Sequence, residues 1–165
     1  MNIVTLRPIS IADRADILRI NAGSRPAVAA LDRAELDRLL ALGEGHLVAV
    51  AGDGAVVAYM LVFAHTCAYD AEEFQYFLAH LQQPFLYVDQ LAVDPGRNRS
   101  GIGSRMYAAL LELARKRQTE WLCCEVNTSP PNPASLDFHR RLGFTAMGNG
   151  DTLDGRRVTF LVRKV

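Results

Sequence analysis

Three consecutive segments in the middle of the chain constrain the fold most, because they describe a strand, a helix and a second strand in close succession. Phe85 to Val93 and Trp121 to Val126 are mainly apolar runs of strand length, and Gly103 to Arg117 has an amphipathic helical pattern. A helix of this length returns the chain to the end at which the first strand began, so the two strands run parallel. The sequence therefore predicts a parallel crossover inside the sheet.

The segments on either side of this crossover predict antiparallel pairing. His46 to Ala51 and Ala55 to Ala64 flank the turn Gly52-Asp53-Gly54, which is a strong hairpin signal. The other expected elements are strands at Asn2 to Pro8, Phe144 to Met147 and Val158 to Val162, and helices after the capping residue Ser10, over Leu31 to Leu42, over Asp70 to Gln83 before Pro84, and from Asn132-Pro133 to Gly143. The expected fold class is α/β (α+β), with a mixed, mostly antiparallel sheet of six to seven strands and helices on both faces.

Composition limits the partners and the compartment. The 165 residues, 50% of them hydrophobic, are not divided by a linker or repeat, so we expect one domain over residues 1–165. Eighteen basic side chains balance 18 acidic ones, which argues against nucleic acid or a membrane surface as a partner. The longest apolar run, Ala55 to Ala64, is too short to span a membrane, and Met1 to Arg7 lacks the features of a secretory signal. We expect a cytoplasmic protein.

The cysteines and two of the histidines predict no metal site. Cys67, Cys123 and Cys124 are an odd number, which suits a reducing compartment. Neighbouring strand residues point to opposite faces, so Cys123 and Cys124 cannot easily bind one zinc ion and are interpreted as buried thiols. His65 and His80 have no converging ligands that the sequence identifies.

The loop that follows Val93 is the segment that points to chemistry. It carries Gly101 and Gly103 and opens directly into a helix, whose first amides have no internal partner and lie at the positive end of the helix dipole. Glycine lets a phosphate approach these amides closely. Arginines at three positions add positive charge nearby: Arg97, Arg99 and Arg105. The segment predicts a phosphate-bearing ligand, and the alternative is a glycine turn that only packs on the sheet.

Two nucleotide-binding motifs do not fit this loop. A Walker loop requires a Gly-Lys-Ser/Thr sequence that is missing here. A dinucleotide fingerprint requires a third glycine or alanine where Met106 stands, and it follows a first strand rather than a late one.

The loop and a second segment together resemble the GNAT superfamily of acyl-CoA-dependent N-acetyltransferases. Asn98-Arg99-Ser100-Gly101-Ile102-Gly103 is similar to the family loop Gln/Arg-x-x-Gly-x-Gly/Ala, with Asn98 departing from it. Asn132-Pro133-Ala134-Ser135-Leu136-Asp137-Phe138-His139-Arg140-Arg141-Leu142-Gly143-Phe144 is similar to the family signature Asn-x-x-Ala/Ser-x-x-Leu-Tyr-x-x-x-Gly-Phe, with His139 in place of the tyrosine. The order of the expected elements extends the resemblance over most of the chain.

The resemblance implies that acetyl-CoA is the cosubstrate, without a metal. It would lie where the strand ending at Val93 separates from the strand starting at Trp121. The pantetheine arm would pair with the backbone of the first strand, and the pyrophosphate would be held by amides of the loop. The cofactor-binding residues implied are Leu91, Ala92, Val93, Arg99, Ser100, Gly101, Ile102, Gly103, Ser104, Asn132 and Ser135.

Acetyl transfer to an amine needs a base, a donor to the carbonyl oxygen and a proton for the leaving thiolate. By resemblance, the Val93 amide is the donor to the carbonyl oxygen. The candidates for the base are Glu125 and Asp89, which interrupt apolar strands, and we favour Glu125. His139 stands where most members of the family place a tyrosine acid. Three interpretations of His139 remain open: a general acid, a cofactor-contacting or amine-binding group, and a packed histidine.

We expect direct acetyl transfer to an amine of a small molecule or peptide, without an acyl-enzyme on Cys123 or Cys124. The alternatives are a catalytically silent acyl-CoA-binding regulatory protein and a phosphate-binding structural domain. In this fold three segments would border the acceptor: Asn21 to Leu31, Thr66 to Pro84 and Gly148 to Arg157. The sequence leaves open the identity of the acceptor and whether the protein forms a homodimer.

Overall fold

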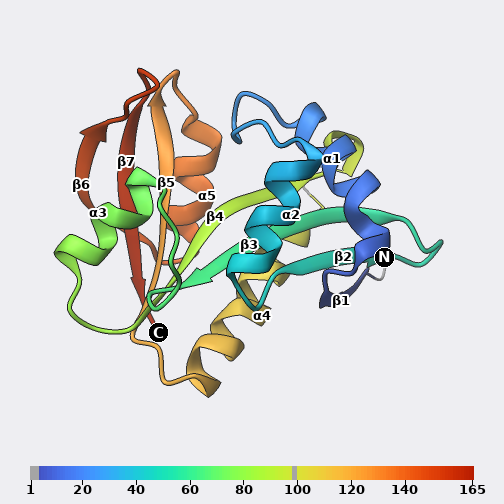
Figure 1. Cartoon of the computed structure of the whole chain (residues 1–165), viewed down its shortest axis with the longest axis horizontal. Coiled ribbons are helices and arrows are strands. Elements are labelled where there is room, and N and C mark those ends of the chain that lie inside the picture. Colours follow the sequence, from blue (N-terminus) through green and yellow to red (C-terminus); the bar gives the residue numbers. More distant parts are fainter. Residues whose placement is uncertain (1–3, 98–99) are drawn as a thin grey trace.

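The computed structural model describes residues 4–97 and 100–165 and contains one seven-stranded sheet (Figure 1). The strands lie side by side in the order β1-β2-β3-β4-β5-β7-β6. Their bounds are β1 Val4–Pro8, β2 Leu47–Ala51, β3 Val56–Ala64, β4 Phe85–Val93, β5 Trp121–Ser129, β6 Thr145–Asp151 and β7 Arg157–Lys164. All neighbouring pairs are antiparallel except β4 and β5, which are parallel. The predicted fold class and the central parallel crossover are confirmed.

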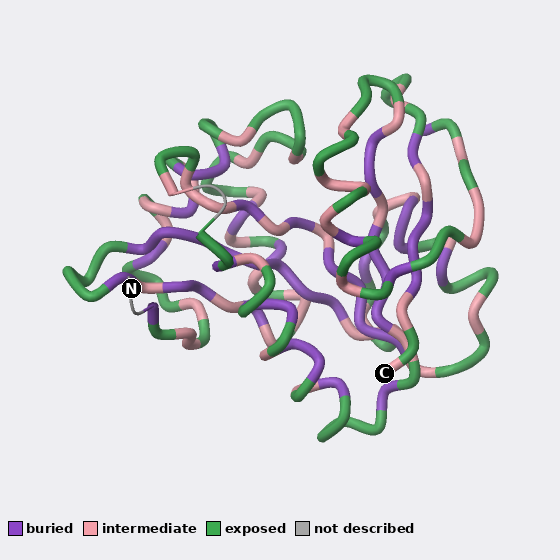
Figure 2. Tube along the Cα trace, turned by 180° about the vertical axis from the view of Figure 1, so that it is seen from behind, coloured by how far each residue is buried: buried purple, intermediate pink, exposed green. Residues whose placement is uncertain are grey.

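Helices cover both faces of the sheet. Their bounds are α1 Arg14–Gly23, α2 Arg33–Leu42, α3 Glu72–His80, α4 Ile102–Lys116 and α5 Pro133–Arg141, with short 3-10 turns at Ile11–Asp13 and Pro95–Arg97. One apolar cluster contains side chains of α1, α2 and α3, and the other contains side chains of α4 and α5. Figure 2 shows buried positions along the strands through the middle of the molecule and exposed positions in the connecting loops. The sheet therefore separates two cores.

The parallel pair β4 and β5 is short. Only three residue pairs align, the last being Tyr87 with Cys123, although each strand is nine residues long. Figure 1 shows β4 turning away from β5, so that β1 to β4 and β5 to β7 form two halves of a splayed sheet. The carboxyl half of β4 thus has a strand partner, β3, on one side only. The predicted separation of these two strands is confirmed.

The boundaries that differ most from the sequence expectation belong to α3, β5 and the hairpin of β6 and β7. The helix expected over Asp70 to Gln83 spans only Glu72–His80, and Leu81 is already extended. Pro84 disfavours helical geometry at the residue before it, so the helix cannot easily continue to Gln83. The strand expected to end at Val126 continues to Ser129 because β7 pairs along its whole length. The hairpin that follows is also longer than predicted, and pairing between β6 and β7 extends to Asp151 and Arg157.

Candidate active site

A β-bulge in β4 sets the geometry of the site. Leu61 of β3 pairs with Gln90, and the next residue, Val62, pairs with Val88, so Asp89 is an extra residue without a partner on β3. A bulge interrupts the alternation of side chains along a strand. Asp89 and Gln90 consequently lie on the same face, the one covered by α1, α2 and α3, and both line the same pocket.

Two carboxylates meet at this bulge. The Tyr87 hydroxyl lies 2.8 Å from a carboxylate oxygen of Glu125 and 3.4 Å from one of Asp89. The Tyr69 hydroxyl donates a second hydrogen bond to Asp89, at 2.8 Å. One tyrosine hydroxyl therefore bridges the two residues that the sequence predicted as alternative bases. The structure brings both candidates into one cluster, although they come from different strands.

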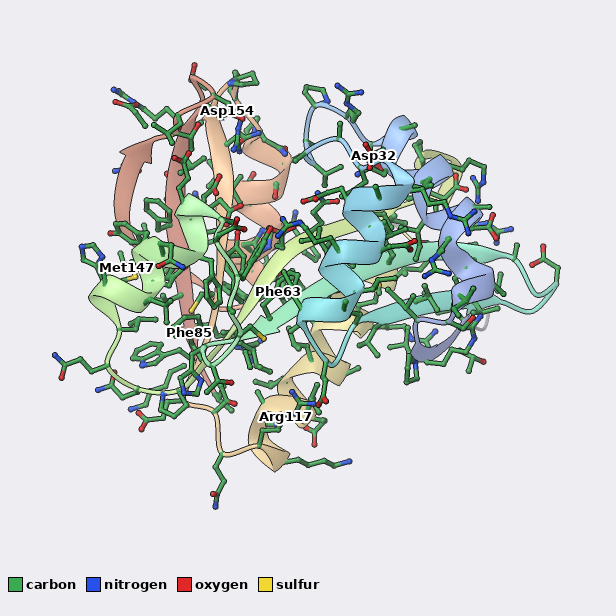
Figure 3. All side chains as sticks on the ribbon, viewed as in Figure 1. Asp32, Phe63, Phe85, Arg117, Met147 and Asp154 are labelled. Carbon is green, nitrogen blue, oxygen red and sulfur yellow. The ribbon has the colours of Figure 1, made fainter. Side chains whose placement is uncertain are left out.

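The two carboxylates line a pocket of about 390 Å³ at the splay between β4 and β5. Asn132 and Ser135, from the start of α5, line the same pocket. The other walls come from the three segments that the sequence predicted to border the acceptor: residues 25–31, residues 69–73 and the turn between β6 and β7. In Figure 3, Asp154 in that turn and Asp32 at the start of α2 are both labelled in the upper part of the molecule, Asp154 over β5 to β7 and Asp32 over α2.

Burial and the charges of neighbouring carboxylates raise the pKa of both carboxyl groups. The pKa of Asp89 rises to about 6, chiefly because burial disfavours the charged form. The pKa of Glu125 rises well above its usual range, first through burial and then through the negative charges of Glu73 and Asp89. A carboxyl group with a raised pKa accepts a proton from an ammonium group more readily than an ordinary one. The electrostatics of the pocket suit general-base chemistry.

Arg156 fixes the turn between β6 and β7 beside the pocket. Its guanidinium donates to Glu73 of α3 at 2.8 Å, to Asn127 of β5 at 3.0 Å and to Asp154 at 2.8 Å. The Leu153 amide also donates to Glu72, at 2.8 Å. Because these bonds join the turn to α3 and β5, the wall of the pocket is held by charge-assisted contacts.

The loop between α1 and α2 forms the opposite wall. Asn21 donates to the Ala29 carbonyl at 2.9 Å and accepts from the Leu31 amide at 2.9 Å. Gln90 donates to the same carbonyl at 3.1 Å and accepts from Tyr59 at 2.7 Å. These polar groups are buried and mutually satisfied, so the loop is anchored directly to β4.

The carboxyl end of β4 presents backbone groups to the splay. The Asp94 amide donates to the Val57 carbonyl of β3, at 2.8 Å. Backbone groups of successive strand residues alternate in direction, so the amides of Leu91 and Val93 point away from β3, and that of Ala92 points toward it. The side chains of Leu91 and Val93 pack in the core beneath α4 and α5. This strand end therefore offers two amides to an extended ligand.

The two glycines at the start of α4 have different structural reasons. Gly101 is the N-cap, with a positive φ of 76°, and among residues 4–97 and 100–165 a Cβ at its position would meet nothing within 4 Å. A Cβ at Gly103 would lie 3.1 Å from the Phe138 ring and 3.7 Å from Leu91, so this glycine permits close packing of α4 against α5 and β4. Gly101 therefore has the open space that a phosphate-bearing ligand would need. Gly103 shows the close packing that the sequence gave as the alternative to a ligand site.

The start of α4 leaves amides free of helical bonds. The first i to i+4 bond there runs from the Arg105 amide to the Gly101 carbonyl, at 3.1 Å. The amides of Ile102, Gly103 and Ser104 precede it, which is the arrangement that binds anions at helix N-termini. Ser100 caps the preceding turn by donating to the Arg97 carbonyl at 2.6 Å. Arg99, also predicted to bind the cofactor, lies outside the described residues, as does Asn98.

Sequence comparison identifies the family. The profile of the acetyltransferase (GNAT) family matches residues 15–144, which is most of the chain. The chain belongs to the GNAT acetyltransferase family. The matched range contains the splay, the bulge at Asp89, the start of α4 and both predicted signatures. A search of curated proteins finds none that matches.

Solved GNAT structures share the fold over nearly the whole chain. Ard1 from Thermoplasma volcanium is 21% identical, with a TM-score of 0.79 over 98% of this chain and 97% of that chain. A phosphinothricin acetyltransferase from Sinorhizobium meliloti, in complex with acetyl-CoA, is 20% identical, with a TM-score of 0.72 over 98% and 88%. Arabidopsis thaliana Naa50, in complex with the bisubstrate analogue CoA-Ac-MVNAL, is 16% identical, with a TM-score of 0.73 over 98% and 99%.

In this GNAT domain His139 is buried on the far side of the sheet from Glu125. It packs among Tyr107, Phe138 and Phe144, in the core beneath α4 and α5. Its Nδ1 lies 2.8 Å from the Ser135 carbonyl, which can only accept, so Nδ1 carries the proton and Nε2 accepts from the Tyr107 hydroxyl at 2.8 Å. Burial lowers the pKa of His139. His139 does not line the pocket that contains Glu125, Asp89, Asn132 and Ser135.

The cysteines of β5 lie in the cores of this GNAT domain. Cys123 and Cys124 are buried on opposite faces, and burial raises the pKa of both thiols. A buried thiol with a raised pKa is a poor nucleophile, because the thiolate is the reactive form. Within residues 4–97 and 100–165, no three His, Cys, Asp or Glu side chains are grouped to hold a metal ion, and no helix is long and apolar enough to cross a membrane.

Several residues of the pocket were not predicted from the sequence. Tyr69 and Tyr87 orient the carboxylates, while Glu73 and Arg156 join α3 to the turn between β6 and β7. Tyr87 carried a usable signal, because it stands two residues before Asp89 in one strand. The ion pair of Glu73 and Arg156 joins residues 83 positions apart, and nothing local marks either residue.

Proposed function

We propose that this GNAT protein is an acetyl-CoA-dependent N-acetyltransferase that transfers the acetyl group directly to an amine of a small molecule or peptide. The observation that supports it most is the juxtaposition of the Glu125 and Asp89 carboxylates, bridged by the Tyr87 hydroxyl, in a pocket at the splay of β4 and β5. A base at this place is next to the carboxyl end of β4, where the amides of Leu91 and Val93 point toward the separation between β4 and β5.

The residues at the splay fit acetyl-CoA. Gly101 leaves open space at the N-terminus of α4, where the amides of Ile102, Gly103 and Ser104 would bind the pyrophosphate. The Leu91 amide would bond the pantetheine arm as an added strand does, which leaves the Val93 amide for the thioester carbonyl. Asn132, which caps α5 by accepting from the Ser135 amide at 3.3 Å, and Ser135 would border the thioester end.

Acetyl-CoA, when bound, supplies the acyl group activated as a thioester. In our proposal Glu125 accepts the proton of the acceptor ammonium, which leaves the amine free to attack. Val93 donates its amide hydrogen to the carbonyl oxygen as negative charge develops there. Tyr87 orients Glu125, and Asp89 raises the basicity of Glu125 through its charge. The second proton of the amine, lost as the amide forms, passes to the departing CoA thiolate, and Cys123 and Cys124 take no part.

We propose a positioning role for His139 instead of a role as general acid. As the neutral Nδ1-protonated form it donates to the first turn of α5 and accepts from Tyr107. Its lowered pKa leaves little imidazolium near neutral pH, and imidazolium is the form that an acid requires. His139 would thereby hold Ser135 and Asn132 at the pocket.

Two measurements test the proposed function. Calorimetry with acetyl-CoA should show binding, and incubation with a broad panel of amines should release free CoA thiol together with an acetylated amine. Binding without thiol release from any amine would instead favour the acyl-CoA-binding regulatory protein. Absence of binding would contradict both.

The pH profile should distinguish the two carboxylates. For Asp89→Asn we expect the acid limb of kcat/KM to move to lower pH by roughly half a unit or more, because removal of a neighbouring negative charge lowers the pKa of Glu125. Asp70→Asn, which removes an exposed carboxylate paired with Arg38, is the control and should leave the limb in place. A loss of about a hundredfold in activity for Asp89→Asn would make Asp89 the base.

Replacement of His139 should affect stability more than the pH dependence of catalysis. His139→Phe leaves the buried Tyr107 hydroxyl without its acceptor, so we expect a loss of about 1 to 3 kcal/mol in the free energy of unfolding, measured in denaturant. The alkaline limb of kcat/KM, along which an essential imidazolium acid would lose its proton, should not change its shape. His80→Phe, at an exposed histidine, is the control. A limb that changes shape only in His139→Phe would restore the general-acid role.

A further inference from the structure

The pocket has an excess of negative charge. Among its described lining residues are five carboxylates, Glu35, Glu73, Asp89, Glu125 and Asp154, and two guanidiniums, Arg25 and Arg156. Arg38, which pairs with Glu35, does not neutralise this excess, because it also pairs with a second carboxylate, that of Asp70. An uncharged or negatively charged occupant would leave this excess uncompensated.

The half-buried arginine of the pocket, Arg156, is already engaged by protein oxygens, so it is poorly placed to bind an anionic substrate. Each of the three nitrogens of the Arg156 guanidinium donates to a protein oxygen, on Asp154, Asn127 or Glu73. Arg25 is exposed on the loop between α1 and α2. By contrast, the described hydrogen-bond partners of Asp89 and Glu125 are tyrosine hydroxyls only. The charged groups of the pocket that have no described cationic partner are thus the carboxylates of Asp89 and Glu125, at its floor.

The negative charge extends from the floor toward α2. The charge of Glu35 contributes to raising the pKa of Asp89, and Glu73 contributes to raising that of Glu125. Glu35 itself stays ionised, since its bidentate bonds from Arg38 lower its pKa. A cation that binds along this wall therefore meets an ionised carboxylate some way from the reacting amine.

The loop facing these carboxylates is apolar. Residues 26–31 read Pro-Ala-Val-Ala-Ala-Leu, and all of them line the pocket. The bonds from Asn21 and Gln90 hold this loop in place. Small aliphatic side chains opposite a row of carboxylates suit a methylene chain with charged nitrogens.

We propose that the acceptor is a small linear aliphatic amine that carries a second positive charge. This inference rests on the proposed function and specifies its substrate. In the reaction the N–C bond forms and the C–S bond breaks. The first proton of the reacting ammonium passes to Glu125, and the second, lost as the amide forms, passes to the departing thiolate, so that CoA leaves as the thiol. The distal ammonium keeps its proton and its charge, and it compensates the carboxylates that remain ionised, Asp89 and Glu35.

Three amines with a four-carbon chain test the proposal: butane-1,4-diamine, butylamine and 4-aminobutanoate. They differ only in the distal group, which is positive, neutral or negative. We expect kcat/KM to be at least about tenfold higher for the diamine than for butylamine, equivalent to about 1.4 kcal/mol, and lowest for 4-aminobutanoate. The preference for the diamine should shrink as salt is raised, because salt screens the distal charge.

Replacement of Glu35 by an uncharged residue tests whether its charge favours the diamine. Glu35→Gln should lower the ratio of kcat/KM for diamine over butylamine by about threefold, the size of one partly exposed charge pair. The matched control, Glu112→Gln, removes a carboxylate that is exposed on α4 and ion-paired at i, i+3 like Glu35, and should leave the ratio unchanged. Equal falls in both variants would contradict the proposed role of Glu35.

Calorimetry separates a failure of this inference from a failure of the proposed function. Binding of the diamine at least about tenfold tighter than butylamine, without thiol release, would support the substrate class and contradict the acetyltransferase proposal. Thiol release with butylamine or 4-aminobutanoate at a rate equal to that with the diamine would overturn the substrate class and keep the proposed function. Failure of the diamine to bind would also overturn the substrate class.

Discussion

Glu125→Gln should reduce kcat/KM for amine acetylation by about a hundredfold to a thousandfold, because the variant keeps the shape of the side chain and removes the proton acceptor. The affinity for acetyl-CoA should change little, since Glu125 lines the pocket, where the Tyr87 hydroxyl bonds to it, and does not contact the amides of α4. The measurement is steady-state thiol release, paired with calorimetry for the cosubstrate. Glu112→Gln serves as the matched surface control.

The same variant should be more stable than the parent protein at neutral pH. The folded-state pKa of Glu125 is raised above its unfolded value, so ionisation costs folding free energy as pH rises from about 4.5 to the folded pKa, at about 1.4 kcal/mol per unit of difference. Glutamine removes this cost, and the gain in Tm should grow across that pH range and vanish below it. Full activity in Glu125→Gln, or a Tm gain independent of pH, would contradict the assignment of Glu125 as the buried base.

Gly101→Asp should weaken binding of acetyl-CoA by about a hundredfold or more, equivalent to about 2.7 kcal/mol. The new carboxylate would occupy the open space at the N-terminus of α4 and repel the pyrophosphate. Aspartate tolerates a positive φ better than most residues, so the backbone can keep its conformation. Calorimetry measures the affinity directly.

Two controls isolate the phosphate interaction. Gly54→Asp places the same residue at another glycine with positive φ, 86°, and open surroundings, in the turn between β2 and β3, and should leave the affinity unchanged. S-acetyl-pantetheine, which lacks the diphosphate, should bind Gly101→Asp and the parent protein equally. If Gly101→Asp binds acetyl-CoA as the parent does, the start of α4 is not the pyrophosphate site.

The fold was predictable from local patterns. The strand Phe85–Val93 was located to the residue, and the crossover and the hairpin followed from apolar periodicity and turn residues. The limits of β5 and β7 were less predictable, since they depend on pairing between two strands that α5 and β6 separate in the sequence. Gly101 and Gly103 were both marked by the loop motif, yet only the structure shows Phe138 against one and open space at the other.

The sequence by itself determined the order of the elements, the parallel crossover and the family, because short-range periodicity and two local signatures encode them. Only the tertiary structure decided which side chains meet. The bulge at Asp89 turns Gln90 to the face on which Asp89 already lies, the parallel pairing of β4 and β5 places Asp89 and Glu125 around the Tyr87 hydroxyl, and packing on the opposite face buries His139 away from them. A bulge and the separation between two strands arise from the competition of pairings across the whole sheet, which no local pattern records.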